Sequence, residues 1–122
     1  MIGYVTLGTN DIEKAAVFYD ELLKLIGAKR FMESEKFIAW TVTPTTPGLC
    51  ITTPFDGNEA TVGNGVMVAL AMDSTDKVDA LYAKAMELGG ADEGPAGPRG
   101  DNFYAAYFRD LDGNKLNAFC MV

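Results

Sequence analysis

Two stretches of this chain, residues 5–28 and 68–91, align without a gap at a separation of 63 positions. Each stretch runs from a short β-prone segment through a helix-cap signal and an amphipathic pattern to glycine. Because a repeat of this kind is one supersecondary unit, the chain is expected to be a duplicated strand–helix module. Seven aligned pairs are identical: Val5/Val68, Leu7/Leu70, Lys14/Lys77, Tyr19/Tyr82, Leu25/Leu88, Gly27/Gly90 and Ala28/Ala91.

Both copies carry the start and stop signals of a helix. In the first, Asn10 is the expected N-cap, with Glu13 at the capping-box position and Gly27 as the stop. In the second, Asp73 is the expected cap and Gly89-Gly90 the stop. The resulting apolar stripes each need a sheet to cover them: Ile12, Ala15, Ala16, Tyr19, Leu22, Leu23 and Ile26 in the first helix, and Val78, Leu81, Tyr82, Ala85 and Met86 in the second.

Strand-like runs surround each helix, so that each half is expected to be βαβββ and the fold class α+β. We expect module one at about 1–56, a linker at about 57–63 and module two at about 64–122. The Gly- and Pro-rich stretch 92–102 is expected to be a loop over a site. The expected strands of the first half are 3–8, 28–34, 36–43 and 48–54. The second half is expected to begin with a strand at the start of the repeat, at 68, followed after the helix by a weak strand near 91–94 and by strands at 102–110 and 114–122.

Length and charge limit the possible classes of function. At 122 residues the chain is long enough for one core-bearing domain, and its formal charge of −7 argues against a nucleic-acid partner. The sequence shows no secretory signal and no apolar run that could span a membrane, so a cytoplasmic protein is expected. Cys50 and Cys120 lie in expected strands and are interpreted as buried thiols.

Two motifs are the most specific in the chain: Asn-Asp leading into a helix with Phe-Tyr at 10–19, and Asp-x-Asp-Gly-Asn at 110–114. With the duplicated pattern, they make the chain resemble the vicinal oxygen chelate superfamily. That group includes glyoxalase I, extradiol dioxygenases, fosfomycin-resistance enzymes and bleomycin-resistance proteins. Leu111 stands where the family usually has proline. The resemblance implies a half-open, U-shaped barrel of about eight strands, with the helices outside and two copies commonly paired into a homodimer.

Family members usually hold a divalent metal that acts as a Lewis acid. The resemblance places Tyr4, Met67 and Asn117 at three metal-ligand positions, and a fourth position near Cys50 or Thr52. Zinc, iron and nickel favour imidazole, thiolate and carboxylate ligands, and the chain has no histidine. Magnesium or manganese can use oxygen ligands, but no two carboxylates map to the barrel interior. We therefore expect no metal cofactor.

The first hypothesis is a metal-free protein that binds a small organic molecule, as bleomycin-resistance proteins do. Aromatic walls with a few polar groups suit such a pocket. For Tyr4 and Asn117, ligand-facing and structural roles stay open. Arg99 can clamp an acidic group or be a solvated loop charge, and Phe103, Phe108 and Phe119 are interpreted as interior filling. The expected ligand-binding residues are Tyr4, Trp40, Cys50, Thr52, Met67, Arg99, Tyr104, Tyr107 and Asn117.

The second hypothesis is an enzyme of the same superfamily, a glyoxalase-like lyase or a dioxygenase, with a divalent metal or a Tyr- or Cys-based mechanism. Tyr4 can act as a general acid if its pKa is lowered. Cys50 can act as a nucleophile only beside a base or a positive charge, and the sequence shows no such pairing. In either case, the sequence leaves the small-molecule partner unnamed.

Overall fold

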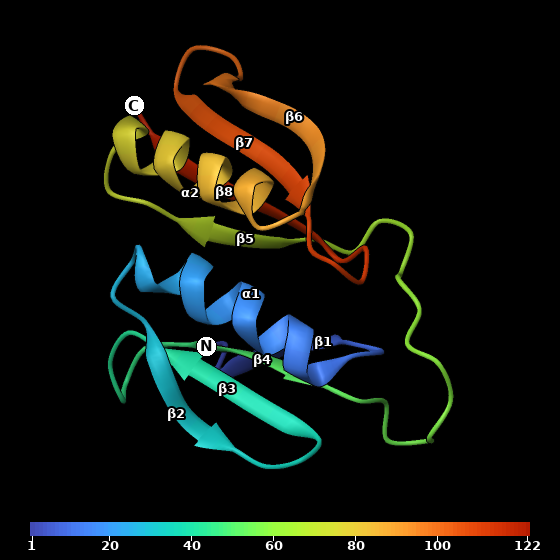
Figure 1. The fold of residues 1–122 in the computed structure, drawn as a ribbon. Coiled ribbons are helices and arrows are strands. Elements are labelled where there is room, and N and C mark those ends of the chain that lie inside the picture. Colours follow the sequence, from blue (N-terminus) through green and yellow to red (C-terminus); the bar gives the residue numbers. More distant parts are fainter. The chain divides into compact units, whose positions relative to one another are not determined.

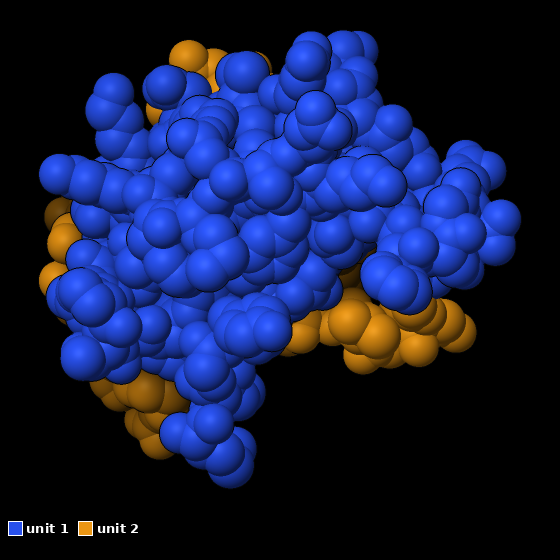
Figure 2. Space-filling model, turned by 90° about the horizontal axis from the view of Figure 1, so that it is seen from below, with its two compact units in different colours: residues 1–62 blue, residues 63–122 orange.

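The computed structural model describes residues 1–122 and contains two helices and eight strands (Figure 1). Two compact units, residues 1–62 and residues 63–122, divide the chain (Figure 2). Unit 1 contains β1 (Tyr4–Gly8), α1 (Ile12–Lys24), β2 (Lys29–Glu33), β3 (Phe37–Thr41) and β4 (Gly48–Thr52). Unit 2 contains β5 (Val68–Ala71), α2 (Thr75–Glu87), β6 (Ala91–Pro98), β7 (Phe103–Arg109) and β8 (Lys115–Met121).

Each unit forms one four-stranded mixed sheet, which confirms the α+β class and the two βαβββ modules. The strand orders are β1-β4-β3-β2 and β5-β8-β7-β6. In both sheets the first strand of the unit pairs in parallel with its last, and the other pairs are antiparallel. The helices begin and end 63 positions apart, as 75 − 12 and 87 − 24 show. The duplication in the sequence is therefore a duplication in the structure.

Both expected helix caps are wrong by one residue. Asp11, not Asn10, caps α1 and accepts a hydrogen bond from the Lys14 backbone N–H. At α2 the cap is Ser74 rather than Asp73, and the Ser74 side chain accepts a hydrogen bond from the Lys77 backbone N–H. Asn10 instead holds the chain at Ala60, where its amide both donates to the carbonyl and accepts from the backbone N–H, at 3.1 and 2.7 Å. Asn, Asp and Ser are all favoured N-cap residues, and each can accept from the free N–H groups of the first helical turn. The preferences of the residues therefore do not decide which of two adjacent positions is the cap.

Strand β6 is longer than the expected strand near 91–94 and takes up most of the expected loop at 92–102. It pairs with β7 through two irregularities, between Asp92 and Gly94 and between Gly94 and Gly97. As the last strand in the order of its sheet, it is at an edge, where Pro and Gly are tolerated because one side of the strand needs no hydrogen bonds. The Gly- and Pro-rich segment, whose composition is typical of a loop, therefore forms an irregular edge strand, and only a short turn follows it.

The cores lie between each helix and its sheet. Burial of the apolar stripe of each helix accounts for its attachment, because each fully buried Leu or Phe contributes roughly 1.5–3 kcal/mol. Neither helix has the length and apolarity that crossing a membrane needs. The buried helix residues are Ala15, Ala16, Phe18, Tyr19, Leu22 and Leu23 in α1, and Val78, Leu81 and Ala85 in α2.

Candidate functional site

Each sheet has one face covered by its helix and another that we call the open face. The covered face is identified by two hydrogen bonds to helix carboxylates: Trp40 Nε1 donates to Asp20 at 2.8 Å, and the Tyr104 hydroxyl donates to Asp79 at 2.6 Å. Because side chains alternate along a strand, the register then assigns every other position. The open face of the second sheet carries Ala69, Ala71, Phe103, Ala105, Tyr107, Arg109, Lys115, Asn117, Phe119 and Met121.

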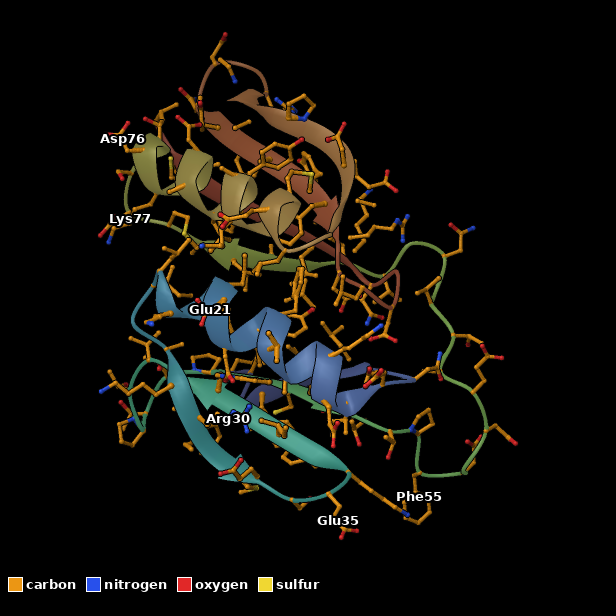
Figure 3. All side chains as sticks on the ribbon, viewed as in Figure 1. Glu21, Arg30, Glu35, Phe55, Asp76 and Lys77 are labelled. Atoms are coloured by element: carbon orange, nitrogen blue, oxygen red, sulfur yellow. The ribbon has the colours of Figure 1, made fainter.

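The expectation that Trp40 faces a ligand is wrong in its choice of face. Its side chain is 1% exposed and lies in the core of unit 1. Asp20, which accepts from its ring N–H, also receives two hydrogen bonds from Arg30, at 2.9 and 2.7 Å. The Arg30 side chain extends from β2 and is labelled in Figure 3. These contacts lower the pKa of Asp20, first through the Arg30 hydrogen bond. The hydrogen bonds among Asp20, Arg30 and Trp40 connect α1 to β2 and β3 and so stabilise the packing of unit 1.

Tyr104 is also on the covered face and does not share a surface with Tyr107. Its hydroxyl is held by Asp79 of α2. That hydrogen bond, with a smaller contribution from desolvation, raises the pKa of Tyr104. A phenol with a raised pKa and a carboxylate partner is a poor proton donor at neutral pH.

On the open face of the first sheet, Tyr4, Cys50 and Thr52 occupy alternate positions of paired strands. Tyr4 is 64% exposed, whereas Cys50 is buried, and this burial raises the pKa of its thiol. The Thr52 hydroxyl contacts the main-chain carbonyls of Lys36 and Thr53 at 3.0 and 2.9 Å. A raised thiol pKa opposes nucleophile chemistry, which needs the thiolate.

Asn117 is the unusual residue of the second sheet. It lies on β8, opposite Tyr107 of β7 and Ala69 of β5, and is 2% exposed. Its side-chain oxygen, Oδ1, is buried and has no hydrogen-bond partner, the one buried side-chain polar atom of the chain in this state. An unpaired buried acceptor costs roughly 1–3 kcal/mol, so native proteins rarely keep one without a reason.

Charged and aromatic side chains lie on the same face of the sheet as this amide. The Arg99 guanidinium lies 5.5 Å from the centre of the Tyr107 ring, and the Lys115 ammonium lies 5.6 Å from it. Further along the same face, the rings of Phe103 and Phe119 stack at 5.3 Å. The open face of the second sheet therefore brings together Asn117, Tyr107 and Arg99 from the expected set, and adds Lys115, which the sequence analysis did not select.

The residues at the metal-ligand positions implied by the resemblance do not fit a metal. Met67 precedes β5 by one residue and is 40% exposed, and Tyr4 and Asn117 offer only a phenol and a neutral amide. No group of three or more His, Cys, Asp or Glu side chains could hold an ion.

Unit 1 has two hollows on its surface. One, of about 570 Å³, is lined by residues of α1, β2, β3 and the turn after β2, among them Ile12, Arg30 and Glu35. The other, of about 360 Å³, lies beside Thr9, Lys36 and neighbouring loop residues. Neither lining includes any of the expected ligand-binding residues, although Thr9 and Lys36 of the second hollow hydrogen-bond the neighbouring Thr52.

The sequence matches the family model of the Glyoxalase/Bleomycin resistance protein/Dioxygenase superfamily over residues 1–118. The chain belongs to this superfamily. A glyoxalase/bleomycin resistance protein from Albidiferax ferrireducens T118 is 36% identical, with 98% of each chain covered and a TM-score of 0.90. A hypothetical protein from S. aureus is 27% identical, covering 98% of this chain and 92% of its own, with a TM-score of 0.75.

Solved structures with lower sequence identity share the fold alone. A genomically encoded fosfomycin resistance protein from Listeria monocytogenes is 20% identical, with a TM-score of 0.72 over 98% of this chain and 92% of its own. No functionally curated protein matches the sequence significantly.

The Asp-x-Asp-Gly-Asn motif at 110–114 forms the hydrogen-bonded turn between β7 and β8. One oxygen of the buried Asp110 carboxylate accepts the backbone N–H groups of Asp112 and Asn114, both at 2.9 Å, and the other accepts the Asn114 side-chain amide at 2.9 Å. Gly113 adopts φ +90° within this turn, a conformation that suits glycine. The turn sets the register of β7 and β8, and so places Lys115 and Asn117 on one face.

Proposed function

We propose that this superfamily member binds a small organic molecule on the open face of the second sheet, without a catalytic metal. The observation that carries the proposal is the buried, unpaired Oδ1 of Asn117. A ligand N–H or O–H donor at this oxygen would remove the cost of leaving it unpaired. Tyr107 beside it, and Phe103 and Phe119 further along the face, would supply the apolar contact area that such sites use.

The metal-free part of the proposal follows from donor chemistry. A neutral amide, a thioether and a phenol are weak ligands for the ions that Lewis-acid catalysis employs, and the chain contains no histidine. Ligand binding should therefore persist unchanged after dialysis against a chelator. A ligand that binds only when a stoichiometric divalent ion is restored would contradict this part and favour the enzyme hypothesis.

The alternative, a lyase or dioxygenase-type enzyme of the superfamily, receives less support from the side chains. The pKa shifts of Cys50 and Tyr104 are both upward, and Tyr104 lies on the covered face. The Cys50 thiol and the Tyr104 hydroxyl are therefore poorly suited to general acid–base catalysis at neutral pH. Turnover of a hemithioacetal by the chelator-treated protein would overturn the binding proposal.

A thermal-shift screen of small molecules tests the site, because a ligand that binds only the native state raises the melting temperature. Each hit is repeated on Asn117→Leu and on a matched control, Asn58→Leu, which changes an exposed amide of unit 1. Hits should lose their shift in the first variant and keep it in the second. Hits that stabilise the wild type and Asn117→Leu equally would place the site elsewhere.

We also propose that two copies of the chain associate. On the first sheet, Tyr4 is 64% exposed, and the Phe31 ring packs against the backbone of Gly48, the register partner of Tyr4, while itself 53% exposed. Together with Met32, 55% exposed, they form an apolar surface that a partner would cover. Light scattering should give twice the chain mass of 13.1 kDa. A mass of one chain at all concentrations would reject the pairing.

A further inference from the structure

The open face of the second sheet is locally positive in a protein that carries a formal charge of −7. Lys115 and Arg109 face each other across β8 and β7, and Arg99 reaches the same face over Tyr107. The one carboxylate in contact with these cations is Glu93, which accepts from Arg109 Nε at 2.6 Å. That hydrogen bond is the main reason why the pKa of Glu93 is lowered. One of the three cations is thus neutralised.

The other two cations donate no hydrogen bond to a carboxylate. Arg99 donates from Nη1 to the Gly97 carbonyl at 3.0 Å and from Nη2 to the Pro95 carbonyl at 2.7 Å. These bonds hold the guanidinium in place but do not cancel its charge. The Lys115 ammonium lies over the Tyr107 ring, and its charge makes a smaller contribution than Arg109 to the lowered pKa of Glu93. Two cations that hydrogen-bond no carboxylate therefore lie over one aromatic ring.

The face changes character along β8. Lys115, Asn117 and Phe119 occupy successive open-face positions, which are roughly 7 Å apart on a strand. The order is a cation that hydrogen-bonds no carboxylate, an unpaired acceptor and a stacked aromatic pair. A molecule lying along the strand would meet a positive end, a hydrogen-bond acceptor and an apolar end in that sequence.

We propose that the ligand is an organic carboxylate with a hydrogen-bond donor next to an apolar or aromatic body. Its carboxylate pairs with Lys115 and Arg99, its donor with Asn117 Oδ1, and its apolar part lies on Phe103 and Phe119. This inference rests on the function proposed above and adds the chemical class of the ligand. Arg99, and not Arg109, takes part in this pairing, because Arg109 already donates hydrogen bonds to Glu93 and, at 2.9 Å, to the Gly113 carbonyl.

The buried position of Oδ1 adds a requirement. A donor reaches this atom only when a neighbouring side chain moves. Lys115 and Arg99 have long rotatable stems, whereas the equally long Arg109 is held by Glu93 and the Gly113 carbonyl. An anion that draws these two cations toward itself would shift them from the Tyr107 ring. Charge recognition and access to Asn117 are thus coupled in the proposal.

Hippurate is the probe, since it carries a phenyl ring, an amide N–H and a carboxylate in the proposed order. Its neutral analogue hippuramide retains the ring and the N–H and lacks the charge. Both are titrated into ¹⁵N-labelled protein at low salt, with the Asn117 side-chain amide and the Tyr107 backbone amide as reporters. Hippurate should shift both signals and bind roughly tenfold more tightly than hippuramide, with the difference reduced by added salt.

Three variants complete the test. Lys115→Met and Arg99→Met should each remove most of the preference for hippurate, about a fivefold to tenfold loss, while leaving hippuramide binding unchanged. The control Lys77→Met removes a positive charge of unit 2 from the first turn of α2 (Figure 3) and should keep the preference. Unchanged melting temperatures confirm that the variants fold.

The outcomes separate this inference from the function on which it rests. Equal binding of the two probes, with the Asn117 signal shifted by both, overturns the carboxylate inference and leaves the small-molecule site standing. If neither probe shifts the Asn117 or Tyr107 signals, the carboxylate inference is overturned, and the site itself is then judged by the thermal-shift screen on Asn117→Leu.

Discussion

Replacing Asn117 with leucine should make the unliganded protein more stable, although most substitutions in a core destabilise. The buried Oδ1 has no partner, so the folded state carries a desolvation cost of roughly 1–3 kcal/mol that an apolar side chain of similar size removes. After allowance for the change in shape, we expect a gain of about 1 kcal/mol, or about 4 °C in melting temperature for a chain of this length.

The matched control is Asn114→Leu, the same substitution at another buried amide of unit 2. Asn114 is 9% exposed, and its side chain donates to Asp110 at 2.9 Å. Removing this donor leaves a carboxylate oxygen of the turn with one partner fewer, which should cost about 1–3 kcal/mol. The two variants therefore change stability in opposite directions, although their residues lie three positions apart in the chain.

The assay is urea unfolding followed by far-ultraviolet circular dichroism, with the free energy of unfolding taken at constant slope. A loss of stability in Asn117→Leu similar to that in Asn114→Leu would refute the reasoning, because Oδ1 would then be making a favourable interaction in the folded protein. A gain in stability together with loss of ligand-induced shifts is the signature of a polar group kept for binding.

Three further outcomes follow from the structure. Gly90→Ala should lower the free energy of unfolding in urea by about 2–3 kcal/mol, because the added Cβ would meet the backbone oxygens of Arg109 and Ala85 at 2.8 and 2.9 Å. Gly27→Ala should lower it by only about 1 kcal/mol, because the space there is open and the cost comes from the backbone angle, φ +78°. Ser74→Ala should lower the melting temperature by a few degrees, since capping is typically worth about 1 kcal/mol. The pKa of Asp20 in the folded protein lies below its usual value of 3.8, so its contribution to stability is fully present above pH 3.8 and is lost as the pH falls through the lower folded pKa. Asp20→Asn should therefore make stability less dependent on pH in this acid range, by about 1 kcal/mol or less given the partial exposure of Asp20. Equal costs for the two glycine variants, an unchanged melting temperature for Ser74→Ala, or an unchanged acid limb would each contradict the corresponding argument.

The errors in the sequence analysis have two different physical origins. Tyr104 and Tyr107 are separated by an odd number of positions on one strand, so alternation alone could have placed them on opposite faces. Trp40 is different, because its face is known only from its pairing with Leu49 of β4 and its bond to Asp20 of α1. Such partners are distant in the chain and leave no local pattern.

Local physical chemistry determined the architecture of this protein from the sequence alone. The two helical stripes and the turn at 110–114 depend on residues within one or two turns of each other. Together with the repeat at 63 positions they predicted the βαβββ modules, and the motifs they contain supported the resemblance to the family. Tertiary structure decided the candidate site. That Asn117 Oδ1 is buried without a partner, and that Arg99 and Lys115 meet over Tyr107, depends on the pairing of β6, β7 and β8 and on side-chain direction. Hydrogen-bond satisfaction is a property of the whole packed structure, and no sequence window contains it.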